Sequence, residues 1–306
     1  MTILLPSADG IAAAVTDRLP HADIATYGKT EPEELAEVTF YCLPYMGDAA
    51  SIALMRDLPR LRVVQSLSSG VDDILPLTPD GVVLCNGRGL YHEESTAELA
   101  VALILAACRS FAMYFEQKQR REWRHERTDT LAGKRVVLVG YGQIGHEIEN
   151  RLRAFGADVA PVSRTGRANV ATLDQLAQVA STADILVACI PLTNETRAII
   201  DAHVLASLPD GALVVNVARG PVIDSDALLN ELTSGRLRAA LDVTDPEPLP
   251  ADRPEWEMTN VFITPHIGGD THEFARRAGS FVADQVQRHL DGEKLANVVL
   301  PTPARV

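Results

Sequence analysis

Cysteine is scarce in this sequence. The four cysteines, Cys42, Cys85, Cys108 and Cys189, lie far apart among 306 residues and form neither a C-x-x-C pair nor a zinc-ligand spacing. This pattern argues against a disulfide scaffold and against a cysteine metal site. We therefore expect reduced, mostly buried thiols in a cytoplasmic protein with no metal centre.

Long apolar runs and positive charge are scarce as well. The most apolar stretch, residues 99–108, is too short to span a bilayer and suits the middle of a buried helix. The first ten residues lack the basic region and long apolar core of a signal peptide. The sequence has 28 Lys and Arg and 41 Asp and Glu, so the formal net charge is −13. Nucleic acid and anionic membranes are therefore not expected as partners.

Short apolar runs alternate with helical patterns along the chain, which is typical of an α/β protein with parallel sheets. The length, with 46% hydrophobic and 23% charged residues, suggests two globular domains. A second alternating series begins at Gly133, and its six strands match a complete doubly wound dinucleotide-binding domain. The expected strands are residues 2–6, 38–44, 62–68, 82–87, 134–140, 157–163, 183–191, 212–218, 239–243 and 261–265, with a helix at 48–59.

Two capping boxes predict long helices. Ser95, with Glu98 three residues later, predicts a helix that starts at about Thr96 and becomes charged after its apolar first half. Such a helix can pass between two domains or lie in a subunit interface. Asp270 and Glu273 predict a second helix, which closes at Gly292 and could carry the chain back to the first domain.

The stretch VVLVGYGQIG places Gly140, Gly142 and Gly145 directly after a strand. The first glycine allows a tight turn, the second lets the backbone approach a pyrophosphate, and the third lets the following helix pack closely. A lone G-x-G-x-x-G is weak evidence, but the surrounding strand, helix and second strand favour a dinucleotide site over a structural turn. Gln143 and Ile144 belong to the same expected site.

At the end of the second strand of such a domain an acidic residue normally holds the ribose 2′-hydroxyl. This sequence has Ser163, Arg164 and Thr165 there, and Arg167 adds a second candidate charge. Hydroxyl donors and a forked guanidinium suit a 2′-phosphate, so these residues favour NADPH. The alternative is that they are surface loop residues and that the protein uses NADH.

Further polar residues follow apolar strands of the second series: Arg219, then His266, and between them the acids Asp242, Asp245 and Glu247 of a Pro-rich loop. Ligands of open α/β sheets bind at this edge. Alone, the arginine could be a surface ion-pairing residue and the histidine a hydrogen-bonded structural residue. Together they supply an anion-binding group, a carboxylate and a titratable ring beside a nicotinamide site.

The motifs VGYGQIG, CIPLTNETRAII, NVARG, ALDVTDPEP and TPHIGG resemble, in type and order, those of the D-isomer-specific 2-hydroxyacid dehydrogenase family. The resemblance covers nearly the whole chain. It implies two doubly wound parallel-sheet domains, with a Rossmann NADP-binding domain (99–280) inserted in a flavodoxin-like substrate domain (1–98 plus 281–306). It also implies homodimers that pair through the cofactor domains.

The same resemblance implies roles for individual residues. Arg219 would bind the carboxylate and the 2-oxo group of the substrate, and His266 would donate a proton to the carbonyl oxygen as hydride arrives. Glu247 would pair with His266 and keep it protonated near neutral pH. In the first domain, SLSSGVDDI resembles the family's carboxylate-binding loop, so Ser69 and Gly70 would supply backbone N–H groups to the substrate.

For the cofactor, the resemblance implies five more positions. Asp242 would lie close to the nicotinamide, and Ile190 and Ala218 would offer backbone groups to its carboxamide. Pro191 and Thr196 would line the cofactor groove.

These residues predict an NADPH-preferring reductase that acts on small 2-oxo acids, with glyoxylate or hydroxypyruvate as first candidates and NADH as a possible cofactor. Formate dehydrogenase chemistry is disfavoured because that branch carries Gln, not an acid, as the partner of the histidine. The alternative from another class is a nucleotide-sensing, corepressor-like binding protein of the same fold. The sequence shows no tail or disordered segment of the kind that would recruit partners, which favours the enzyme.

Overall fold

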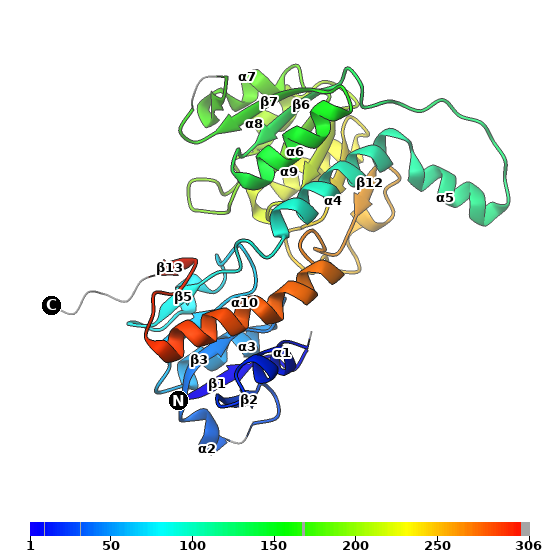
Figure 1. The fold of residues 1–306 in the computed structure, drawn as a ribbon. Helices are drawn as coiled ribbons and strands as arrows, with labels where there is room; N and C mark the ends of the chain where they lie inside the picture. Colours follow the sequence, from blue (N-terminus) through cyan, green and yellow to red (C-terminus); the bar gives the residue numbers. More distant parts are fainter. Residues whose placement is uncertain (9, 31, 167–168, 301–306) are drawn as a thin grey trace. The chain divides into compact units, whose positions relative to one another are not determined.

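The structure is a computed structural model that describes residues 1–8, 10–30, 32–166 and 169–300. The chain forms two compact units (Figure 1). Unit 1 comprises residues 1–92 and 269–306, and unit 2 comprises residues 93–268. Unit 2 therefore lies between the two segments of unit 1 along the chain, as the expected domain insertion requires. The boundaries expected at 98/99 and 280/281 fall inside helices.

Unit 1 contains, within the described residues, a six-stranded sheet in the order β13-β5-β4-β3-β1-β2. The first five strands along the chain are parallel, and β13 pairs with β5 in the antiparallel direction. The parallel order 2-1-3-4-5 is that of flavodoxin-like sheets, so the expected fold is confirmed. The strands are β1 (Thr2–Leu5), β2 (Asp23–Thr26), β3 (Val38–Cys42), β4 (Val63–Gln65), β5 (Val83–Cys85) and β13 (Val298–Leu300).

Helices cover both faces of this sheet. On one face α1 (Ile11–Arg18) packs against α10 (His272–Asp291) around a core that includes Phe40 and Phe274. Gly279 permits this close approach, because a Cβ there would lie 2.6 Å from Cβ of Ala14. On the other face the core of Tyr41 and Met55 is covered by α3 and the turns beside it. The helical segments here are α2 (Pro32–Leu35), α3 (Ala49–Ala53) and the 3-10 helices Leu54–Asp57 and Leu75–Leu77.

Unit 2 contains, in the part of the chain described, a seven-stranded parallel sheet in the order β12-β11-β10-β9-β6-β7-β8. The order reverses between β6 and β9, which is the arrangement of a Rossmann domain and marks the point where such sheets bind ligands. The expected Rossmann fold is confirmed. The strands are β6 (Arg135–Val139), β7 (Asp158–Ser163), β8 (Ala171–Thr172), β9 (Ile185–Ala188), β10 (Leu213–Asn216), β11 (Arg238–Leu241) and β12 (Val261–Ile263).

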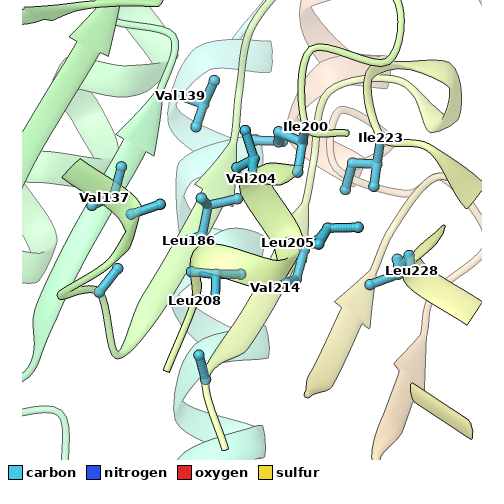
Figure 2. Packing of buried hydrophobic residues seen from close by; sticks show 14 of the residues in the cluster. Val137, Val139, Leu186, Ile200, Val204, Leu205, Leu208, Val214, Ile223 and Leu228 are labelled. Atoms are coloured by element: carbon cyan, nitrogen blue, oxygen red, sulfur yellow. The ribbon is translucent and has the colours of Figure 1, made fainter. Parts of the chain in front are cut away.

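The central strands of unit 2 are apolar on both sides because helices cover both faces. One face packs against α4 and α6, and the other against α7, α8 and α9. Figure 2 shows Leu205 of α8, and Leu208 directly after that helix, beside Leu186 of β9 and Val214 of β10. The helices are α4 (His92–Cys108), α5 (Phe111–Arg120), α6 (Gln143–Ala154), α7 (Leu176–Ala180), α8 (Ala202–Ser207) and α9 (Ser225–Thr233), with short 3-10 helices at Leu173–Gln175, Gly220–Val222 and Pro254–Trp256.

The first long helix differs from the sequence prediction at both ends. It begins at His92 rather than at Thr96, so Ser95 lies inside α4 and does not cap it. It also breaks in the middle, because Ser110 has a φ of 51°, which a right-handed helix cannot continue. As a result α5 is a separate helix, bent by 62° from α4. Within the described residues, no single helix is long and apolar enough to cross a membrane, although this bent pair together reaches that length and hydropathy.

The last helix begins one residue later than expected. Its N-cap is Thr271, whose hydroxyl accepts a hydrogen bond from the Phe274 N–H (3.1 Å), and not Asp270. The predicted end is correct, since Gly292 closes α10 in the left-handed conformation. The whole of α10 belongs to unit 1, which is why a boundary at residue 280 divides it.

Candidate active site

The glycine loop after β6 has the geometry that the sequence predicted. A Cβ on Gly140 would lie 2.7 Å from the backbone of Cys189, and one on Gly145 would lie 2.6 Å from the carbonyl oxygen of Gly140. Gly142 is the N-cap of α6, and apart from its neighbours along the chain no described atom lies within 4 Å of the position that a Cβ would take there. Two glycines thus permit close packing, and the third leaves an open approach to the start of a helix. This cradle fits a pyrophosphate.

The residues at the end of β7 are accessible. Ser163 is the last residue of the strand, and Arg164 and Thr165 follow it on the surface. The Arg164 side chain is 72% exposed, and its Nη1 lies 3.9 Å from Oε2 of Glu195, which is 73% exposed. The Arg164 guanidinium therefore follows the strand end at which an acidic residue normally binds the ribose 2′-hydroxyl. Arg167 lies outside the described residues.

The segment after β9 forms a tight turn. Ile190 is buried and Pro191 is exposed. The hydroxyl of Thr196 is also buried; it donates to the carbonyl oxygen of Pro191 (2.6 Å) and accepts from the N–H of Thr193 (2.8 Å). Thr196 thereby fixes the shape of the turn.

Arg219 follows β10 and is positioned by a buried asparagine. The Asn216 side chain donates to the carbonyl oxygen of Arg219 (2.9 Å) and accepts from the N–H of Ala218 (3.0 Å). The next residue, Gly220, touches the loop after β11, because a Cβ there would lie 1.9 Å from the carbonyl oxygen of Thr244. Sequence reasoning identified neither Asn216 nor Gly220 as functional, although both stand in the segment that carries Arg219.

Glu247 and His266 form a direct pair. Oε1 of Glu247 lies 2.5 Å from Nδ1 of His266, and both side chains are partly exposed. His266 has a φ of 52°, and its N–H donates to the carbonyl oxygen of Asp242 (2.8 Å). The imidazole Nδ1 is therefore engaged by the carboxylate, which leaves Nε2 as the nitrogen that can face a substrate.

The charge state of Glu247 follows from its neighbours. Partial burial by itself raises the pKa of this carboxyl. The hydrogen bond and charge of His266 act in the opposite direction, and so do the Thr244 N–H and the Arg219 guanidinium. The net result is a pKa below the usual value for Glu247, so the carboxylate is charged throughout the neutral range.

Asp242 is buried and holds the segment that carries His266. Its Oδ1 accepts from the Thr264 hydroxyl (2.6 Å) and from the Ile267 N–H (2.9 Å), and its Oδ2 accepts from the Gly268 N–H (2.9 Å). These bonds tie β11 to the residues on both sides of His266.

Ser69 and Gly70 belong to unit 1, in the loop between β4 and β5. The carbonyl oxygen of Ser69 accepts from the Asn86 side chain (3.0 Å). The Ser69 hydroxyl oxygen is buried and has no hydrogen-bond partner among the described residues. Buried polar atoms are usually paired, so this loop has capacity for a further polar group. No set of three or more His, Cys, Asp or Glu in the described residues is arranged to hold a metal ion.

The Rossmann sheet with its glycine cradle defines the class of the protein as one with an NAD(P)-binding domain, and the family comparison gives an oxidoreductase. The family model described as D-isomer specific 2-hydroxyacid dehydrogenase, NAD binding domain, matches residues 101–268. The chain belongs to this family, as the sequence motifs predicted.

Individual relatives agree with this assignment. The chain is 34% identical over 263 residues to a glyoxylate/hydroxypyruvate reductase A of Arabidopsis thaliana, with 82% of each chain covered. It is 32% identical over 301 residues to a D-3-phosphoglycerate dehydrogenase of Methanocaldococcus jannaschii, covering 94% of this chain but only 57% of that relative. A D-isomer specific 2-hydroxyacid dehydrogenase from Xanthobacter autotrophicus Py2, crystallised with NADPH and MES, has a TM-score of 0.79 at 30% identity, with 98% of both chains covered.

Proposed function

We propose that this protein is an NADPH-preferring reductase that converts small 2-oxo acids to D-2-hydroxy acids. The observation that carries this proposal is the contact of 2.5 Å between Glu247 and His266, with Arg219 acting on the same carboxylate. The relatives guide the choice of substrate and cofactor. Because the Arabidopsis relative is a glyoxylate/hydroxypyruvate reductase and the Xanthobacter relative binds NADPH, these compounds are the first to test.

The cofactor would be held mainly by unit 2. The glycine loop and the first turn of α6, with Gln143 and Ile144, would bind the pyrophosphate. Ser163, Arg164 and Thr165 would bind the 2′-phosphate. Asp242, Ile190 and Ala218 would lie near the nicotinamide, and Pro191 and Thr196 would line the cofactor groove. When bound, NADPH supplies the hydride that reduces the substrate carbonyl carbon.

The protein's own residues would handle charge and the proton. Arg219 would pair with the substrate carboxylate and the 2-oxo group, and the backbone N–H groups of Ser69 and Gly70 would be further donors to the substrate. Nε2 of His266 donates its proton to the carbonyl oxygen as the carbon accepts hydride, and takes it back in the oxidative direction. Glu247 stabilises the protonated ring through Nδ1.

We also propose a homodimer that pairs through unit 2. Figure 1 shows α5 and the segment after it projecting from the rest of that unit. Phe111 and Phe115 pack edge to face on α5 (ring centroids 6.2 Å apart) yet are about half exposed, and Trp123 is fully exposed. Apolar side chains gathered in this way mark an interaction surface. Sedimentation analysis tests this, since a monomer at micromolar concentration would contradict it.

We place the protein in the cytoplasm, where its four free thiols stay reduced.

A spectrophotometric panel of 2-oxo acids, each run with NADPH and with NADH, tests the proposed reaction. We expect turnover of glyoxylate or hydroxypyruvate with NADPH. Nucleotide binding without turnover of any 2-oxo acid would instead favour the corepressor-like alternative.

A further inference from the structure

Glu195 occupies a fixed position beside the expected cofactor site. It precedes Thr196, whose buried hydroxyl holds the turn through Pro191 and Thr193. The N–H of Thr196 also donates to the carbonyl oxygen of Thr193 (3.2 Å). The backbone at Glu195 is therefore held by hydrogen bonds on both sides of the turn, while its side chain is in solvent.

The partner of Glu195 is Arg164, at 3.9 Å. Arg164 follows β7, and Glu195 lies in the turn that follows β9. Both strands pair with β6, on opposite sides, and β6 ends in the glycine loop. The pair thus joins the two strands that flank the expected pyrophosphate site.

We propose that Glu195 determines cofactor preference together with Arg164. The acid that is missing from the end of β7 is present on the neighbouring turn. In the free protein the Glu195 carboxylate pairs with the guanidinium and competes with the 2′-phosphate of NADPH for it. With NADH the pair stays intact, and Glu195 accepts a hydrogen bond from the free 2′-hydroxyl. The protein therefore uses both cofactors, with a preference for NADPH smaller than Arg164 alone would give. This inference rests on the cofactor assignment of the proposed function.

The size of the effect follows from the exposure of the pair. An exposed ion pair changes an equilibrium constant by up to about 5-fold. Repulsion between Glu195 and the phosphate adds to this and is screened by salt. For E195Q we expect the Kd of NADPH to fall roughly 3- to 10-fold and the Kd of NADH to rise about 2- to 5-fold, because a neutral amide neither competes for Arg164 nor accepts as strongly.

The test is direct binding to the full-length protein, measured by calorimetry for NADPH, NADH and the fragments 2′,5′-ADP and 5′-AMP. E195Q should bind NADPH and 2′,5′-ADP more tightly than the wild type and NADH more weakly. At high salt, most of its effect on the binding of the two 2′-phosphate ligands should disappear. In an R164A background the gain for NADPH should shrink, since no guanidinium remains to be released. The matched control is D210N, which removes an exposed carboxylate paired with Arg236 (3.7 Å). Asp210 precedes the amino end of β10, whereas Glu195 follows the carboxyl end of β9.

The outcomes separate this inference from the proposed function. Glu195 has no role in cofactor preference if E195Q changes the Kd of NADPH and of NADH equally, or changes neither more than D210N does. This holds even if the protein reduces 2-oxo acids as proposed. If the wild type binds NADPH with the expected response to E195Q but reduces no 2-oxo acid, the proposed reaction fails and the role of Glu195 holds. If the wild type binds neither nucleotide, both are wrong.

Discussion

Oε1 of Glu247 lies 2.5 Å from Nδ1 of His266, and the backbone of His266 is tied to Asp242 by its own N–H. The ring is therefore oriented at two points, by a charged side chain and by the main chain. Only Nε2 remains for proton transfer, so the geometry assigns a single direction from which a substrate carbonyl can be protonated.

Replacing His266 by Ala should lower kcat for reduction by roughly 10²- to 10⁴-fold, the usual range for a lost general acid. Binding of NADPH, measured by fluorescence titration, should change little, because the substitution leaves the glycine loop unchanged. A variant that retains most of its turnover would remove His266 from the mechanism.

Replacing Glu247 by Gln should move the pH profile of reduction. The hydrogen bond and charge of His266 help to hold the pKa of the Glu247 carboxyl below its usual value, so the carboxylate is charged in the neutral range. Without that charge the protonated imidazole is less favoured, and activity should fall off at a lower pH than in the wild type. An unmoved profile with a reduced rate would mean that Glu247 only positions the ring.

Removing the Arg164 side chain should raise the KM of NADPH by roughly 10- to 100-fold, the range that a hydrogen bond to a charged group allows. NADH kinetics should change little. The double variant S163D/R164A should go further and invert the preference, because the new acid repels the phosphate and accepts from the ribose hydroxyl. Equal weakening of both cofactors by R164A would show that this loop does not recognise the phosphate.

Replacing Gly220 by Ala should impair catalysis through the backbone. The added Cβ would lie 1.9 Å from the carbonyl oxygen of Thr244, so the segments that carry Arg219 and Glu247 must move apart. A displacement of about 1 Å can cost about 100-fold in rate, and we expect at least roughly a 10-fold loss of kcat/KM. The control is G81A, where φ is +80° and, apart from neighbours along the chain, no described atom lies within 4 Å of the new Cβ. It should lower Tm without lowering kcat, and equal kinetic losses in both variants would refute the role of the contact.

The fold was predictable where the apolar pattern was strong. The central strands β6, β9 and β10 are buried on both faces and were found from their apolar runs. The edge strand β2 could not be predicted because its four residues, DIAT, mix polar and apolar side chains. The edge strand β13 is apolar but only three residues long, too short for its pattern to indicate a strand. The break between α4 and α5 was missed because a positive φ at Ser110 leaves no mark in the composition.

The site was predictable at the level of single residues but not of the contacts between them. Arg219, Glu247 and His266 stand in motifs that can be found along the chain. The close approach of Gly220 to Thr244 joins residues that are far apart in the sequence, and no local pattern indicates it. For the same reason the sequence did not identify the pairing of Glu195 with Arg164.

The four cysteine thiols differ from thiols free in solution in their reactivity. Cys189 donates to the carbonyl oxygen of Gly140 (3.1 Å), and burial raises its pKa to about 12. Burial likewise raises the pKa of Cys85 to about 11 and that of Cys42 and Cys108 above the usual value. Since alkylating reagents attack the thiolate, these groups are nearly inert at neutral pH while the chain stays closed around them. Cys42 and Cys85 in unit 1 and Cys108 in unit 2 are buried, so the rate at which each is alkylated measures local opening of its unit, whereas Cys189 is partly exposed.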